Sequence, residues 1–175
     1  MKNYILLLLA AAFTTVSCIR PDSLEQQLKT LKSIPIEMDF ARSAALTDSA
    51  SIIDKWNLIL FFDSTECSTC KLRGLGRCDE FVKAANDRST GVWFIVAPKK
   101  EKNDITRFTL KALLPKSANV VIDSQNIFAK TNSHIPSNPD LHAFLLDSNN
   151  NVVLVGNPMQ NQKVGDLFWE IISKE

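Results

Sequence analysis

The chain has 175 residues, of which 20 are Lys or Arg and 19 are Asp or Glu, so its formal net charge is only +1. This balance argues against nucleic acid as a partner, because proteins that bind nucleic acid carry a strongly basic surface. The length is sufficient for one domain with a substantial hydrophobic core.

The first residues have the pattern of an export signal. Lys2 precedes an apolar run over residues 4–13, which is too short to cross a bilayer, and a small residue stands just before Cys18. The pattern resembles a bacterial lipoprotein signal, although such signals usually have Leu where this chain has Thr15. We therefore expect residues 1–17 to be removed and the sulfur of Cys18 to carry the lipid that anchors the protein to a membrane. Secretion without lipidation is the alternative.

Residues 18–50 are expected to hold the lipidated cysteine, a tether and one amphipathic helix. Ser23 can cap a helix, and three leucines at helical spacing follow it, so we predict a helix over residues 23–32. Pro35 ends this pattern. For residues 34–50 an edge strand and a loop are one interpretation, but we favour a solvated lead-in that carries no chemistry.

Residues 51–175 are expected to form one α/β domain. Apolar runs predict strands at residues 58–62, 92–97, 120–123, 143–147 and 152–155, and helical patterns predict helices at 67–86, 103–113, 125–130 and 161–173. The Ser-Asn-Asn-Asn stretch at residues 148–151 predicts a hairpin turn, because Asn tolerates positive φ. This order of elements predicts a mixed sheet with helices on both faces.

The motif Cys67-Ser68-Thr69-Cys70 lies where the first of these strands gives way to a helix. Two thiols at this spacing can close into a disulfide and reopen, which is the chemistry of a thiol-disulfide oxidoreductase. Backbone N–H groups at the start of the helix favour the thiolate of Cys67, the expected nucleophile, and Cys70 would be the resolving thiol. A structural zinc half-site and a pair of inert core cysteines are the alternatives. Cys78 is expected to be a small core residue.

With this cysteine pair after its first core strand, the chain resembles the thioredoxin fold, and in particular the TlpA-like group of envelope thiol-disulfide oxidoreductases, of the kind found as lipoproteins in Bacteroidota. The resemblance covers about residues 51–175. It rests on Phe61-Phe62, on residues 67–71, and on Phe144 to Asp147 with the hairpin that runs to Gly156. It implies a membrane-anchored protein that exchanges disulfides with protein thiols or disulfides of the cell envelope and needs no organic cofactor. Residues 19–22 show no strongly acidic export tag, so we favour a membrane location that faces the periplasm.

Three positions depart from the pattern of the thioredoxin family. Glu66 replaces the usual aromatic residue before the first cysteine, and we expect its carboxylate to point to solvent. Phe61 stands six residues before Cys67, where many thioredoxins have a buried acid. The family's cis-proline position is occupied by Leu141, so either Pro139 substitutes for that proline in a reshaped loop or the proline is absent.

By this alignment Pro139, Leu141 and His142 form the substrate loop that faces the catalytic pair Cys67 and Cys70. His142 could accept a proton or serve as a third ligand for a soft metal such as copper(I), but we favour a polar residue on the outward face of a strand end. Two alternative functions therefore stay open. One is a copper-binding protein of thioredoxin fold that uses the two cysteines and His142, and the other is an interaction scaffold with little catalytic activity.

Overall fold

The computed structural model describes residues 23–46, 55–63, 78–98, 110 and 112–174. The cysteine motif at 67–70, Glu66 and the lipidation candidate Cys18 lie outside these residues, as does most of the helix predicted at 103–113. The helices are α1 (Leu24–Leu31), α2 (Asp39–Ala44), α4 (Asp79–Asn86), α6 (Ile127–Thr131), α7 (Gln162–Ile172) and the 3-10 helix η1 (Pro139–Leu141). The strands are β1 (Trp56–Phe62), β2 (Thr90–Val96), β3 (Asn119–Ile122), β4 (Ala143–Leu146) and β5 (Val152–Val155).

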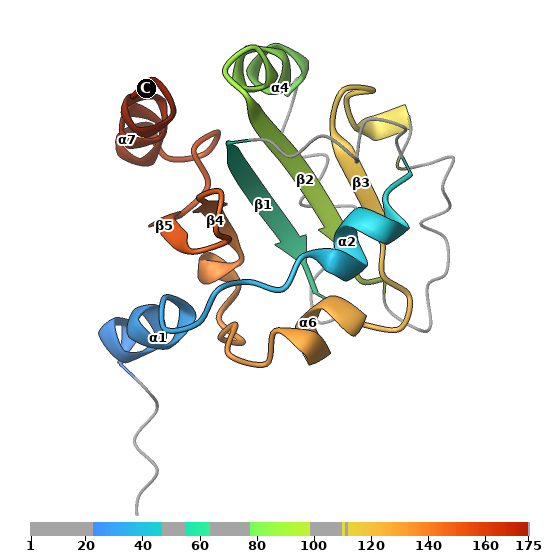
Figure 1. Ribbon diagram of the computed structural model, residues 1–175, viewed down its shortest axis with the longest axis vertical. Helices are drawn as coiled ribbons and strands as arrows, with labels where there is room; N and C mark the ends of the chain where they lie inside the picture. The colour runs from blue at the N-terminus through green and yellow to red at the C-terminus, as the bar shows by residue number, and fades with distance from the viewer. Residues whose placement is uncertain (1–22, 47–54, 64–77, 99–109, 111, 175) are drawn as a thin grey trace, which may run out of the picture.

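The strands form one mixed sheet in the order β3-β2-β1-β4-β5. β1, β2 and β3 run parallel, whereas β4 is antiparallel to both β1 and β5, so that β1 lies at the centre (Figure 1). Leu60 of β1 is in register with Phe94 of β2 and Ala143 of β4. The continuous apolar runs of β1 and β2 fit this position, because a central strand is covered on both faces. The fold is therefore the thioredoxin-like α/β fold that the sequence predicted.

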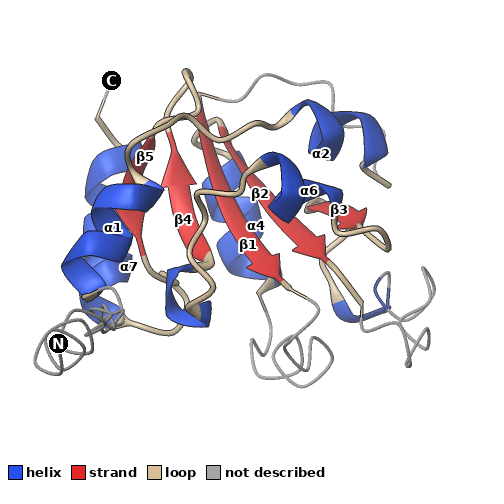
Figure 2. Ribbon diagram, turned by 90° about the horizontal axis from the view of Figure 1, so that it is seen from below, coloured by secondary structure: helices blue, strands red, loops and turns tan. Residues whose placement is uncertain are grey.

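The central strand sends its side chains alternately to two separate cores. Leu58, Leu60 and Phe62 point to the face covered by α4 and α7. Ile59 and Phe61 point to the opposite face, which is covered by α1, α2, α6 and η1. Figure 2 shows this second layer in front of the sheet, with α4 behind it.

The stretch before the sheet is not the solvated lead-in that we expected for residues 34–50. Ile36, Met38 and Ala41 are at most 1% exposed and belong to the same core as Ile59 and Phe61. The run is too short and too irregular to show a helical or strand period in the sequence. The burial of this segment therefore could not be predicted from the sequence, because it results from contact with the face of the sheet.

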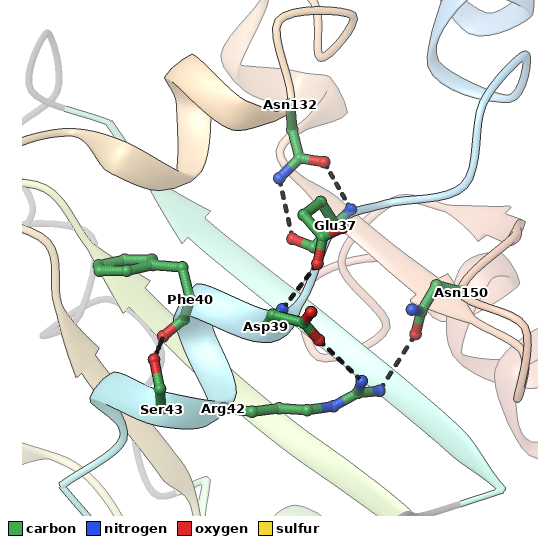
Figure 3. Close-up of polar contacts among 7 residues, drawn as sticks. All are labelled: Glu37, Asp39, Phe40, Arg42, Ser43, Asn132 and Asn150. Atoms are coloured by element: carbon green, nitrogen blue, oxygen red, sulfur yellow. Dashed lines mark hydrogen bonds and ion pairs between the residues drawn. The ribbon is translucent and has the colours of Figure 1, made fainter.

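Polar side chains hold this segment in place (Figure 3). The Asn132 side chain accepts a hydrogen bond from the Glu37 N–H at 2.7 Å and donates one to the Glu37 carbonyl at 3.0 Å. In the β4–β5 hairpin, the Asn150 carbonyl accepts from the Ile36 N–H at 2.9 Å, and the Asn150 side chain accepts from Arg42 at 3.3 Å. The N-terminal segment is thus tied to two connections that are far from it in sequence.

Helix starts follow local side-chain chemistry. The Ser23 hydroxyl accepts from the Gln26 N–H, which confirms the predicted cap, and the Asn161 side chain caps α7 in the same way. The buried Asp123 carboxylate accepts from the first two N–H groups of α6, at 2.8 and 2.7 Å. Within the described part of the chain, none of the helices is long and apolar enough to cross a membrane.

Candidate functional site

The edge of the sheet where β1 ends contains a pocket of about 390 Å³. Its three walls come from the last residues of β1, from the connection that contains η1 and leads into β4, and from the connection between β5 and α7. The lining residues are Leu60, Phe61, Phe62, Pro139, Asp140, His142, Ala143, Gly156, Asn157, Gln160, Asn161 and Val164. The segment that bears the cysteine motif begins directly after β1 and Asp63, so the pocket lies at the point where that segment leaves the sheet.

Gly156 brings the β5–α7 connection close to the start of β4. Its φ is +122°, a conformation that side chains disfavour, and a Cβ atom at this position would lie 3.0 Å from Cγ2 of Val164. The Gly156 N–H donates a hydrogen bond to the Ala143 carbonyl at 2.7 Å. A glycine therefore fits this position, where the connection packs against Val164 of α7 and bonds to β4.

The three predicted substrate-loop residues have different environments. Pro139 begins η1 and lines the pocket, and the described residues contain no cis peptide bond. Leu141 is 4% exposed and packs in the core with Phe144, so its side chain does not line the pocket. Of the predicted loop, Pro139 and His142 are the residues that a molecule in the pocket could contact.

His142 is buried, not on the outward face of a strand end as we expected. The residue is 4% exposed, and its Nε2 atom lies 2.8 Å from the Pro136 carbonyl oxygen. Because a carbonyl only accepts, Nε2 is the donor in this hydrogen bond, and Nδ1 is closed to solvent with no hydrogen-bond partner among the described residues. The prediction failed because η1 ends at Leu141, so strand alternation does not apply to the residue that follows it.

Phe61 takes part in a cluster of rings beneath the pocket. Its ring centroid lies 5.1 Å from that of His142 and 5.3 Å from that of Phe128. The Phe61 N–H also donates to the His142 carbonyl at 2.9 Å. The position where many thioredoxins have an acid is therefore apolar and filled in this chain.

A metal site is not visible in the part of the chain that the structure describes, where no three His, Cys, Asp or Glu residues cluster. His142 could offer a metal only Nδ1, and that atom is closed to solvent in this conformation. We therefore do not assign His142 as a ligand.

Cys78 is a free thiol at the N-cap position of α4 and is 3% exposed. Burial raises the pKa of this thiol, and the neighbouring Asp79 carboxylate raises it further. Both effects disfavour the reactive thiolate, so the prediction of a small core residue is confirmed. The other cysteines of the chain, Cys18, Cys67 and Cys70, lie outside the described residues.

Sequence reasoning missed the third wall of the pocket. Gly156-Asn157-Pro158 is a strong turn signal, and the Asn157 side chain accepts from the Met159 N–H at 3.0 Å. That signal predicts a turn but does not say what lies opposite. The pairing of β4 with β5 decides that this turn faces η1.

No protein-family model matches the sequence, and comparison with curated proteins gives no match. Among solved structures, similar chains include the thioredoxin domain of a thiol-disulfide oxidoreductase from Bacteroides vulgatus, at 13% identity and a TM-score of 0.49, covering 69% of this chain and 81% of that one. The exposed lipoprotein thioredoxin of Streptococcus pneumoniae has 21% identity and a TM-score of 0.47, with 67% and 85% covered. A thiol:disulfide interchange protein from Bacteroides sp. has 14% identity and a TM-score of 0.47, with 66% and 72% covered. These are likenesses of fold.

Proposed function

We propose that this protein is a lipid-anchored thiol-disulfide oxidoreductase of the cell envelope, which exchanges disulfides with partner proteins through Cys67 and Cys70. One observation carries the proposal. β1, the central strand of a thioredoxin-like sheet, ends at the edge that contains the pocket, and the Cys-x-x-Cys motif begins five residues after its last residue, Phe62. Cys67 comes four residues after Asp63, so chain length limits the distance between their Cα atoms to about 14 Å.

The proposed exchange proceeds in two balanced steps. The Cys67 thiolate attacks one sulfur of a partner disulfide, which forms a mixed disulfide and releases the other partner sulfur as a thiolate that takes up a proton. The Cys70 thiolate then attacks the Cys67 sulfur, closes the Cys67–Cys70 bond and releases the second partner thiol. Two electrons pass to the partner, and the reverse sequence oxidises a partner dithiol.

The pocket supports this proposal because it offers a recess for a partner residue at the end of the strand that leads to the cysteine motif. Apolar groups of β1 form one wall, and Asn157, Gln160 and Asn161 supply amides on another. A recess of this mixed character suits a peptide segment, whose backbone needs hydrogen bonds and whose side chains need apolar contact.

The direct test is reduction of a protein disulfide, such as that of insulin, by the protein with an added dithiol. We expect Cys67→Ser to abolish the catalysed rate and Cys70→Ser to accumulate the mixed disulfide. The matched control is Cys78→Ala, which removes a buried thiol and should retain activity. Equal rates for the wild type and Cys67→Ser would instead support the scaffold alternative.

Metal analysis tests the remaining alternative, a copper-binding protein of thioredoxin fold. Protein purified in reductant should contain no stoichiometric copper if it is an oxidoreductase, whereas one copper per chain that is lost in Cys67→Ser would support the copper-binding function.

The anchor and location are tested at Cys18. Mass spectrometry of the processed chain should show acyl groups on Cys18 as the first residue. Cys18→Ser should move the protein from the membrane fraction to the soluble fraction of the envelope. A wild-type chain that is soluble and unacylated would contradict the anchor without affecting the thiol chemistry.

A further inference from the structure

The described walls of the pocket carry one acidic group and no basic one. Among the described lining residues, Asp140 has the only Asp, Glu, Lys or Arg side chain. It is exposed, and its carboxylate makes no hydrogen bond or ion pair within the part of the chain that the structure describes. A molecule in the pocket therefore meets an unpaired negative charge on the wall that contains η1.

The backbone that carries this carboxylate is fixed on both sides. Pro139 begins η1 with a restricted φ. The Asn138 side chain accepts from the Asp140 N–H at 3.1 Å, and the Asn138 carbonyl accepts from the Leu141 N–H at 3.0 Å. The buried side chains of Leu141 and His142 follow directly. The wall is thus ordered before a ligand binds, which reduces the entropic cost of binding there.

The amides of the third wall suit a peptide backbone and not a cation. The side-chain oxygen of Asn157 accepts from the Met159 N–H at 3.0 Å, and that of Asn161 accepts from the Val164 N–H at 3.2 Å. Their NH₂ groups are left as donors, which can bond to the carbonyls of a bound peptide. Asp140 is therefore the group on these walls that can pair with a positively charged side chain.

Two positive groups near the pocket are weaker or displaced. The N-terminus of α7 carries a partial charge of about +0.5, and the Asn161 side chain already caps it. Lys163 is exposed, lies about 100° around the helix from Val164 and is not a lining residue. The full negative charge of Asp140, on the wall itself, therefore decides the sign of the charge that a bound side chain meets.

We propose that the pocket selects partner proteins with a lysine or arginine beside the cysteine that Cys67 attacks, and that Asp140 determines this specificity. The inference rests on the proposed thiol exchange, because that reaction brings the partner chain to this edge of the sheet. The basic side chain pairs with Asp140 while the backbone of the partner bonds to the amides of Asn157 and Asn161. An exposed pair of this kind contributes selectivity among partners more than affinity.

Reduction of charged peptides tests this specificity. The substrates are symmetrical disulfides of the blocked tetrapeptide Ala-Cys-Xaa-Ala, in which Xaa is Lys, Gln or Glu, and the full chain reduces them with an added dithiol. We expect kcat/KM to fall in the order Lys, Gln, Glu, with a Lys-to-Glu ratio of at least about fivefold at low ionic strength. The ratio should approach one in about 1 M salt, where the screening length is about 3 Å.

Two matched variants show whether Asp140 is responsible. Asp140→Asn keeps the shape of the side chain but removes its charge, and should reduce the Lys-to-Glu ratio to less than about twofold. Asp166→Asn removes the same charge from the exposed side of α7, outside the pocket lining, and should retain the wild-type ratio. A ratio near one in the wild type, or the same ratio in all three proteins, would overturn the inference and leave the proposed exchange intact.

A binding measurement without thiols separates this inference from the proposed function. The probes are the same tetrapeptides with Ser in place of Cys, titrated into the full chain and followed by NMR at the Gly156 and Val164 N–H groups. We expect larger shifts with the Lys peptide than with the Glu peptide at equal concentration, and no such difference in Asp140→Asn. If this difference is present but no peptide disulfide is reduced, the thiol exchange is wrong and the preference of the pocket for a basic side chain stands. Equal shifts, or none, with the Lys and Glu peptides would overturn the charge selection.

Discussion

The two faces of the sheet are covered in different ways. On one face, α4 and α7 bury Val82, Ala85, Phe168 and Ile172 against the strands, and the packing is apolar. On the other face, α2 and α6 contain six and five residues, and hydrogen bonds to buried or half-buried side chains hold them. Helices this short contribute few apolar side chains, so polar contacts add to the packing of Ala41 and Phe128 in fixing their places.

Aromatic side chains contribute to the apolar packing on the face covered by α4 and α7. The rings of Phe81, Phe168 and Trp169 lie with centroids 5.0 to 5.3 Å apart, and the Arg88 guanidinium lies 5.4 Å from the Trp169 ring. This face is therefore expected to tolerate changes in polar groups and to respond strongly to loss of volume.

The largest expected effect comes from truncation on the apolar face. Phe168→Ala should lower the free energy of unfolding by about 3–5 kcal/mol, because it removes a fully buried ring and leaves a cavity. Leu167→Ala, next to it on α7 but 48% exposed, is the matched control and should change stability by less than about 0.5 kcal/mol. Urea denaturation measures both, and similar losses in the two variants would show that α7 is not held by packing.

A smaller effect is expected from a polar anchor on the other face. Asp123→Ala should cost about 2–3 kcal/mol, because its carboxylate is 1% exposed and accepts from the Ile127 and Phe128 N–H groups. Asp166→Ala, on the exposed side of α7, is the control and should cost only a few tenths of a kcal/mol, about that of a helix-surface pair. If exchange at the Ile127 and Phe128 amides is unchanged in Asp123→Ala, α6 does not depend on this anchor.

The smallest expected effect is a pH dependence in the β4–β5 hairpin, which supplies Asn150 to the polar face. Partial burial acts to raise the pKa of Asp147, but hydrogen bonds from the Asn151 side chain and from the Asn151 and Asn149 N–H groups outweigh it and lower the pKa. Because the pKa is lower in the folded state, this stabilisation is present above about pH 4 and is lost as pH falls through the lowered pKa.

Asp147→Asn should therefore be less stable than the wild type at pH 6, by less than about 1 kcal/mol, with the difference closing by pH 3. Thermal unfolding over that range measures it. A difference that persists at pH 3 would mean that the turn depends on shape and not on the charge of Asp147.

The contrast between the faces also explains how far the sequence could be interpreted. The strands, the hairpin and α7 have clear apolar periods and local caps, and the structure confirms each of them within a few residues. α2 has no such period, and the burial of Ile36 and Met38 comes from contact with strands that are distant in the chain. The fold class could be predicted because a sheet of this kind is built from long local patterns.

For the candidate site, residue identities were predictable but environments were not. The motif at Cys67 and Cys70 remains the prediction on which the proposed thiol chemistry depends. His142 was singled out by its position, yet its burial, its tautomer and its contact with Phe61 depend on where η1 ends. Gly156 lies at the site because β4 pairs with β5, which the sequence alone did not predict.

By itself, the sequence determined which stretches become strands and helices and which side chains can carry chemistry, because these depend on local periodicity and residue type. The tertiary structure alone decided that the 132–142 connection and the β5–α7 connection meet at the end of β1, and that His142 is buried there. The physical reason is that a pocket and the burial of a ring are properties of several segments packed together, and no single segment specifies its neighbours.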